Sequence, residues 1–162
     1  MDSCTELKSL LDEQFDIIIS NYVLMDLLDL EGAIRAFNRV LKPSGIAILV
    51  FSHPCFPQDK STTVNEDGTV SYGWGSSYFE RTQRNEQPWK HFTTPFIWFH
   101  RPLSDYWKAF KSAGFSVEEF EEPRITPEQY HLAENDRKLF NYKTRPYSVV
   151  FKLQKVKIIR NS

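Results

Sequence analysis

The sequence predicts an α/β fold whose sheet is mostly parallel, on three observations. Residues 15–21 and 46–51 are short runs with apolar side chains on both faces, as in strands covered on both sides. An amphipathic helix lies between them, and such strand-helix-strand units are right-handed in nearly all known proteins. The last run, 147–156, alternates in its second half, as an antiparallel strand does. The sheet is therefore expected to hold parallel strands and to end on an antiparallel one.

The helix of the first unit has clear limits. Asp29 is a typical amino-terminal cap, and Lys42-Pro-Ser-Gly45 is expected to end the helix. Its apolar residues recur every three or four positions, namely Leu30, Ala33, Ile34, Phe37, Val40 and Leu41. The strand that follows leads into a His53-Pro54 corner.

A stretch from about 53 to 101, here called the aromatic flap, follows this strand. Its aromatic residues include Tyr72, Trp74, Tyr78, Phe79, Trp89, Phe92, Phe96, Trp98 and Phe99. Stretches this long are uncommon unless they are lids or binding loops or contain short strands. Short strands are expected near 71–74 and 95–99. The aromatic side chains could stack a planar or cationic substrate, or could simply pack on the body of the domain.

Three further elements complete the chain. Residues 102–114 form an amphipathic helix that ends at Gly114, and 115–120 form a third strand. Thr126-Pro-Glu-Gln129 is a capping box with proline at the first helical position, which predicts a polar helix to about Asn141.

Composition limits the class of protein. A chain of 162 residues suits one domain, 1–162, with the flap as an insertion. A net charge of −1 with interspersed signs argues against a nucleic-acid surface or a polybasic membrane patch. Cys4 and Cys55 are too few for a disulfide framework or a zinc site, so we expect two reduced thiols, no bound metal and a cytoplasmic protein. No apolar run is long enough to span a membrane.

Three segments resemble the carboxy-terminal half of class I S-adenosylmethionine-dependent methyltransferases, of the type 11 kind. They are Phe15-Asp-Ile-Ile-Ile-Ser-Asn-Tyr-Val-Leu24, Asp29-Leu-Glu-Gly-Ala-Ile-Arg-Ala-Phe-Asn-Arg-Val-Leu-Lys-Pro-Ser-Gly45, and His100-Arg-Pro-Leu-Ser-Asp-Tyr-Trp107 leading to Ala113-Gly-Phe115 and Glu121-Glu-Pro123. The resemblance implies a Rossmann-like sheet, S-adenosylmethionine as the cofactor and a small-molecule methyl acceptor.

The chain also departs from that family. The family's acidic Gly-x-Gly-x-Gly loop, which allows close backbone approach to the cofactor, is absent, and so is the acidic residue that binds the ribose hydroxyls. The resemblance therefore predicts an amino-terminally truncated domain that is incomplete as given. It implies that Asp2 or Ser3 meets the adenine amino group and that the amide of Cys4 meets a ring nitrogen.

Cofactor and substrate residues are expected at the carboxyl ends of the parallel strands, where open α/β sheets bind ligands. The resemblance places Asn21, Tyr22 and Val23 against the methionine part of the cofactor, although Asn21 could instead only end its strand. His53, on the expected substrate side, could act as a general base or could be a structural corner residue. Asp26 could face the same pocket or cap the next turn.

Substrate contacts are expected from His53, Trp98, His100 and Arg101. Arg101 could grip a carboxylate or phosphate, or could pair with Glu121 or Glu122 and hold the flap.

Two functions from different classes compete. The first is methyl transfer to a small acceptor. The second is a non-catalytic remnant that pairs through the apolar edge at 15–20, as a homodimer or with another chain. A third hypothesis is that the chain is half of a nicotinamide dehydrogenase. This hypothesis lacks the glycine fingerprint and does not explain the Lys-Pro-x-Gly turn.

Overall fold

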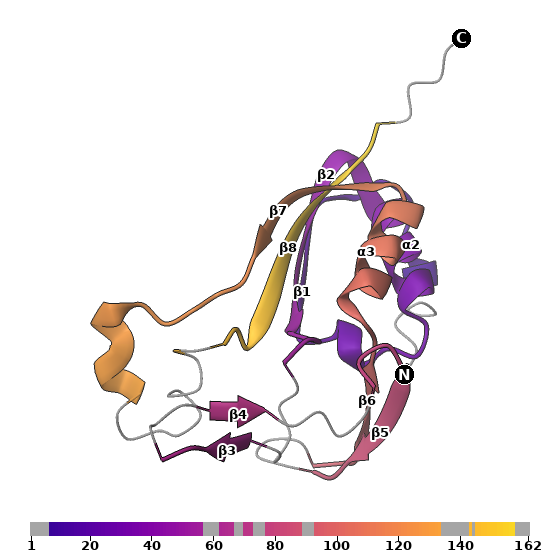
Figure 1. The fold of residues 1–162 in the computed structure, drawn as a ribbon. Coiled ribbons are helices and arrows are strands. Elements are labelled where there is room, and N and C mark those ends of the chain that lie inside the picture. Colours follow the sequence, from indigo (N-terminus) through magenta and orange to yellow (C-terminus); the bar gives the residue numbers. More distant parts are fainter. Residues whose placement is uncertain are drawn as a thin grey trace.

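The computed structural model describes residues 7–56, 62–66, 70–72, 77–88, 93–133, 143 and 145–157. Its centre is a four-stranded sheet of β1 (Phe15–Asn21), β2 (Leu41–Ser52), β8 (Ser148–Lys155) and β7 (Phe115–Glu121), in that spatial order. β1 and β2 are parallel, and β8 lies antiparallel between β2 and β7. β1, β2 and β7 therefore run the same way, which confirms the predicted α/β sheet with its final antiparallel strand (Figure 1).

Two helices cover one face of this sheet (Figure 1). α2 (Leu30–Val40) crosses from β1 to β2, and α3 (Leu103–Ser112) precedes β7. Asp29 caps α2 as predicted, because its Oδ1 accepts a hydrogen bond from the Gly32 amide at 2.8 Å. Among the described helices, none is long and apolar enough to cross a membrane.

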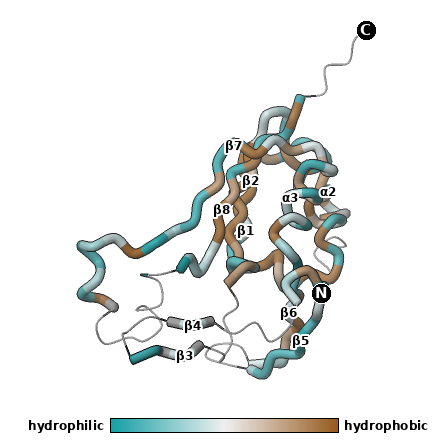
Figure 2. Tube along the Cα trace, viewed as in Figure 1, coloured by the Kyte–Doolittle hydropathy of each residue, from teal (hydrophilic) through white to brown (hydrophobic). Residues whose placement is uncertain are grey.

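The core lies between the helices and the sheet, where the apolar colouring of Figure 2 is concentrated on the strands. Phe51 is fully buried there and stacks on Tyr106, with ring centroids 4.3 Å apart, and on Phe151 at 5.9 Å. The fully buried apolar residues around them include Leu24, Leu30, Ile34, Leu41, Leu49, Phe110, Phe115 and Leu153.

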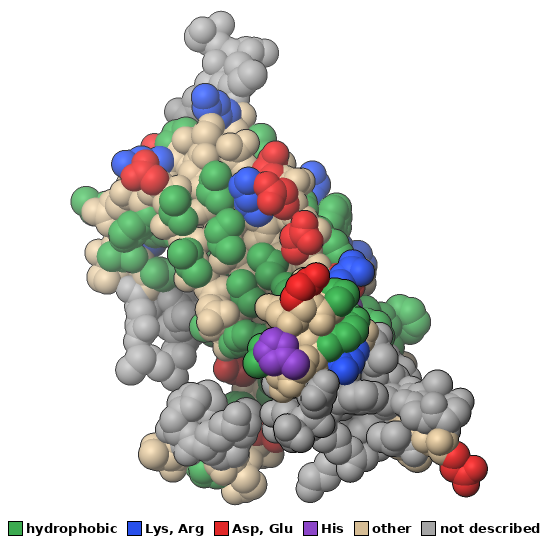
Figure 3. Space-filling model, turned by 90° about the vertical axis from the view of Figure 1, so that its left-hand side faces the viewer, with side chains coloured by type: hydrophobic (Ala, Val, Ile, Leu, Met, Phe, Trp, Pro, Cys, Tyr) green, Lys and Arg blue, Asp and Glu red, His purple; other side chains and the backbone are tan. Residues whose placement is uncertain are grey.

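The opposite face of the sheet lacks such a cover in the part of the chain that the structure describes. Ile17 and Ile19 of β1 are 60% and 72% exposed, and Figure 3 shows apolar side chains gathered over this face. The expectation that β1 is covered on both sides is therefore wrong for this chain. The apolar residues of β1 predicted a second packing layer that the described residues do not supply.

β2 begins earlier than its apolar run. The strand is continuous from Leu41, which pairs with Phe15. The next pair is Ile17 with Ile46, so the register between β1 and β2 shifts here. The Lys42-Pro-Ser-Gly45 turn is accommodated as an irregularity in the strand, with Ser44 at φ +64°. A Cβ at Gly45 would lie 2.9 Å from the Lys42 carbonyl oxygen, so this position requires glycine.

Two small antiparallel hairpins form within the aromatic flap. β3 (Thr62–Val64) pairs with β4 (Val70–Tyr72), and β5 (Thr82–Glu86) pairs with β6 (Phe96–His100). β4 and β6 match the two short strands expected from the sequence, whereas their partners β3 and β5 were not expected. Trp74, Trp89 and Phe92 lie outside the described residues.

Three short 3-10 segments complete the elements: η1 (Leu7–Ser9), η2 (Leu24–Asp26) and η3 (Pro127–Ala133). η3 occupies the start of the predicted polar helix, and its capping contact is present, since the Thr126 amide donates to Gln129 Oε1 at 3.1 Å. The remainder of that predicted helix, to Asn141, lies outside the described residues.

Candidate functional site

The carboxyl ends of β1, β2 and β7 meet at one edge of the sheet, together with the amino end of the antiparallel β8. Asn21 is opposite Val50, and Ser52 is opposite Ser148. The corner that follows each strand therefore brings together residues from four distant parts of the sequence. This is the edge at which open α/β sheets bind ligands.

Tyr22 has a strained backbone at this edge. Its φ is +54°, a left-handed conformation that is uncommon for a residue with a side chain. Its amide donates to the Val50 carbonyl at 2.8 Å, and its hydroxyl hydrogen-bonds with Ser148 Oγ. Burial raises the pKa of the neighbouring Tyr147, whose ring lies 6.0 Å from that of Tyr22. These contacts fix Tyr22, while Asn21 and Val23 on either side of it remain exposed.

His53 is buried and both of its ring nitrogens have partners. Nε2 lies 2.7 Å from Glu122 Oε1, and Nδ1 accepts a hydrogen bond from the Cys55 amide at 3.2 Å. Because Nδ1 accepts, the ring proton is on Nε2 and points at the Glu122 carboxylate. The His53 amide also donates to the Tyr147 carbonyl at 2.9 Å. This geometry ties the end of β2 to the residue just after β7.

Tyr78 joins the flap to the start of α3. Its hydroxyl accepts a hydrogen bond from the Leu103 amide at 2.8 Å and one from Cys55 Sγ at 3.3 Å. Burial, with a smaller contribution from the Cys55 hydrogen bond, raises the pKa of Tyr78 to about 12, so its hydroxyl stays neutral. The Tyr78 carbonyl oxygen lies 2.8 Å from His100 Nε2.

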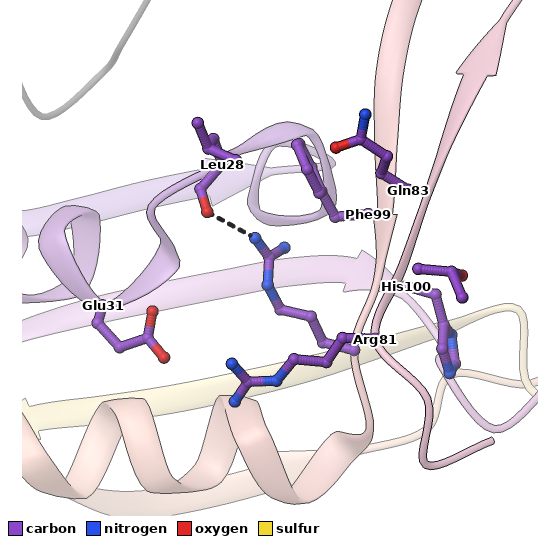
Figure 4. Close-up of a pocket in the computed structure, with 8 residues that line it drawn as sticks. Leu28, Glu31, Arg81, Gln83, Phe99 and His100 are labelled. Atoms are coloured by element: carbon purple, nitrogen blue, oxygen red, sulfur yellow. Dashed lines mark hydrogen bonds between the residues drawn. The ribbon is translucent and has the colours of Figure 1, made fainter. Parts of the chain in front are cut away.

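A pocket of about 320 Å³ lies between the β5–β6 hairpin and the segment from η2 to α2 (Figure 4). Its lining residues are Leu28, Glu31, Arg81, Thr82, Gln83, Phe99, His100 and Arg101. Arg101 Nη2 donates to the carbonyls of Leu27 at 2.5 Å and Leu28 at 3.0 Å, and its Cζ lies 4.9 Å from the Phe99 ring centroid.

The expected pairing of Arg101 with Glu121 or Glu122 is wrong. Glu122 contacts His53 instead, and Arg101 binds backbone carbonyls after η2. Burial raises the pKa of Tyr106 to about 12, and the nearby Arg101 guanidinium acts in the opposite direction. Arg101 therefore connects the flap to the segment between β1 and α2.

The residues proposed from the sequence fall into separate groups. His100 and Arg101 line the pocket, whereas His53 lies at the Glu122 corner and Trp98 packs against the core beneath Arg84, whose Cζ is 4.4 Å from its ring centroid. Asn21, Tyr22 and Val23 lie at the end of β1. Asp2, Ser3 and Cys4 lie outside the described residues.

Sequence reasoning missed Glu122 as the partner of His53, Ser148 as the partner of Tyr22, and Arg81 as a pocket residue. The pairs His53–Glu122 and Tyr22–Ser148 are 69 and 126 positions apart. The weak available signal was that Glu122 follows one strand and Ser148 begins another, and these two strand ends lie at the edge where β1 and β2 end. Arg81 had no such signal.

Comparison with known proteins connects this fold to a class. The fold resembles that of an S-adenosylmethionine-dependent methyltransferase from Mesorhizobium loti, with a TM-score of 0.74 and 20% identity over 90% of this chain. A Methanosarcina mazei protein described as a SAM-dependent methyltransferase gives a TM-score of 0.56 and 17% identity over 93% of the chain. The chain thus has the fold of these methyltransferases, of which it spans 64% and 63% of the length, respectively.

The sequence itself matches the family described as "Methyltransferase domain" over residues 2–49. That segment contains β1, α2 and most of β2, including the Asn21 edge. The match and the fold together confirm the resemblance to the class I S-adenosylmethionine-dependent methyltransferase family. No curated protein matches the sequence.

Proposed function

We propose that the protein binds S-adenosylmethionine at the edge formed by Asn21, Tyr22 and Val23 and supports methyl transfer to a small-molecule acceptor. The observation that carries this proposal is the family match over 2–49, which includes this edge. The described residues fit one side of such a cofactor. Asn21 offers an amide side chain and Val23 offers an exposed apolar surface. Tyr22 lies between them, and its hydrogen bond to Ser148 fixes its position.

In this proposal the adenine end of the cofactor is bound by Asp2, Ser3 and Cys4, in the roles that the family resemblance implies. Bound S-adenosylmethionine supplies a methyl group on a sulfonium, which is already a good leaving group. The protein's task is then to hold the acceptor in line with that methyl group and to exclude water. No general base is required.

On the acceptor side, the proposal assigns binding to His100 and Arg101, which line the pocket. Trp98 supports His100 from the core, with the two ring centroids 6.1 Å apart. His53 is given a positioning role rather than that of a base, because its Nε2–H faces Glu122 and its Nδ1 accepts from the Cys55 amide. It holds the ends of β2 and β7 at the rim of the site.

The test is titration calorimetry with S-adenosylmethionine on the parent chain and on Asn21→Ala. We expect the variant to bind about three- to tenfold more weakly, the effect of one lost hydrogen bond. Asn85→Ala, at an exposed position of β5, is the matched control and should bind as the parent does. Equal affinity for Asn21→Ala and the parent would remove Asn21 from the site.

A second candidate function is a non-catalytic module that pairs with a second copy of itself. It is favoured by the exposed apolar side chains of Ile17 and Ile19 on an edge strand. Light scattering tests it directly. A dimer that binds no S-adenosylmethionine would favour this module, whereas a monodisperse monomer would contradict it.

A further inference from the structure

The guanidinium of Arg101 is a buried charge with an incomplete set of partners. The residue is 8% exposed, and its Nη2 is shared by two carbonyls, but its Nη1 has no hydrogen-bond partner among the described residues. No described carboxylate forms an ion pair with it, and the Tyr106 hydroxyl, with which its side chain hydrogen-bonds, is neutral and supplies no counter-charge. Buried charges are costly unless they are paired. Nη1 itself is closed to solvent, but Arg101 also lines the pocket, so an anion bound there would offset the charge of its guanidinium.

A second guanidinium lies at the same pocket. Arg81 is held by Asp105, with Nε 2.7 Å from Oδ2, and its side chain is 61% exposed. Asp105 contacts the guanidinium only at Nε. Figure 4 shows the Arg81 side chain extending along the pocket toward Glu31. The planar fork of arginine suits two-oxygen anions such as carboxylates.

The remaining lining residues restrict the ligand further. Glu31 is exposed at the pocket and would repel a dianionic phosphate more strongly than a singly charged carboxylate. Phe99 and Leu28 provide apolar walls, and Gln83 adds an amide (Figure 4). A volume of about 320 Å³ is at the small end of the range for ligand pockets, roughly 300–1,000 Å³.

We propose that this pocket binds the carboxylate of a small organic acid between Arg81 and Arg101, with the apolar part of the acid against Phe99 and Leu28. Calling this acid the methyl acceptor rests on the proposed function. Carboxylate binding at this pocket does not depend on S-adenosylmethionine binding, because none of the pocket residues belongs to the Asn21 edge.

The test uses benzoate as the probe, in a chemical-shift titration of the ¹⁵N-labelled protein without S-adenosylmethionine. Benzoate should produce saturable shifts at the amides of Leu28, Thr82 and Gln83, and Arg81→Gln should weaken its binding about three- to tenfold, the loss of one exposed charge-assisted contact. Benzamide, which has the same shape without the charge, should bind much more weakly than benzoate.

Arg84→Gln is the matched control, because Arg84 lies on β5 three residues after Arg81 but outside the pocket; the variant should bind benzoate as the parent does. If Arg101→Lys folds, it tests the contribution of the buried charge. If it does not fold, Arg81→Gln still tests the site, because Arg81 lies at the surface. Equal binding of benzamide, tighter binding of inorganic phosphate, or no effect of Arg81→Gln would each overturn the proposal. None of these outcomes bears on S-adenosylmethionine binding, which is measured separately at the Asn21 edge.

Discussion

The carboxyl group of Asp26 lies at the end of η2, next to the buried residues Leu24 and Met25. Although the residue as a whole is exposed, partial desolvation raises the pKa of its carboxyl from 3.8 to about 6. The folded protein therefore binds a proton at Asp26 more readily than the unfolded chain does. The stability associated with the protonated form is complete below pH 4 and is lost as the pH rises through about 6.

Asp26→Asn should remove this pH dependence. A pKa unit corresponds to about 1.4 kcal/mol, but solvent screening at an exposed residue reduces the whole effect to about 1 kcal/mol. We expect the variant to be more stable than the parent by about that amount at pH 7.5 and similar to it at pH 4, in urea denaturation. Glu80→Gln, at an exposed position, controls for the loss of one charge. A constant difference between Asp26→Asn and the parent across this pH range would contradict the assignment.

At the scale of single residues, His53 shows what a sequence can and cannot tell. Its position just after a parallel strand correctly predicted that it lies at the carboxyl edge. Which way its ring nitrogens point depends on Glu122, which follows β7 two strands away in the sheet, and on the turn that places the Cys55 amide within 3.2 Å. Neither contact has a local sequence signal.

At the scale of elements, the proposed self-association depends on β1. In the described sheet β1 is an edge strand, and its apolar side chains Ile17 and Ile19 are exposed. If two copies pair through this strand, Ile19→Lys should weaken the dimer roughly tenfold or more, because the lysine charge would be desolvated at the junction. Sedimentation velocity over a range of concentrations measures this.

The control for this prediction is Leu132→Lys on η3. Leu132 is 57% exposed, comparable to Ile17, but lies on a different element. It should leave the association unchanged. If both lysine variants dissociate to the same extent, association depends on general surface apolarity and not on β1.

The main elements could be predicted because their patterns are strong. α2 has both a capping residue and a regular apolar face, and the apolar runs of β1 and β8 are bounded by polar residues. β5, with the sequence Thr-Gln-Arg-Asn-Glu, has no apolar alternation, and its strand conformation comes from pairing with β6. This hairpin also brings Arg81 to the pocket, so the pocket could not be assembled from sequence alone although His100 and Arg101 were identified.

At the scale of the whole molecule, the two proposed sites lie on different elements of the fold. The Asn21 edge lies where β1, β2 and β8 meet, and the Arg81–Arg101 pocket lies between the flap hairpin and the segment that follows η2. Arg101 connects the flap to the segment after η2 through the carbonyls of Leu27 and Leu28.

The most direct test of this account follows the backbone amides of Asn21, Tyr22 and Val23 while S-adenosylmethionine is added to the ¹⁵N-labelled protein. The account predicts saturable chemical-shift changes at these three amides, reduced in Asn21→Ala and retained in Asn85→Ala. A folded protein whose three amide signals do not move at millimolar S-adenosylmethionine would contradict it.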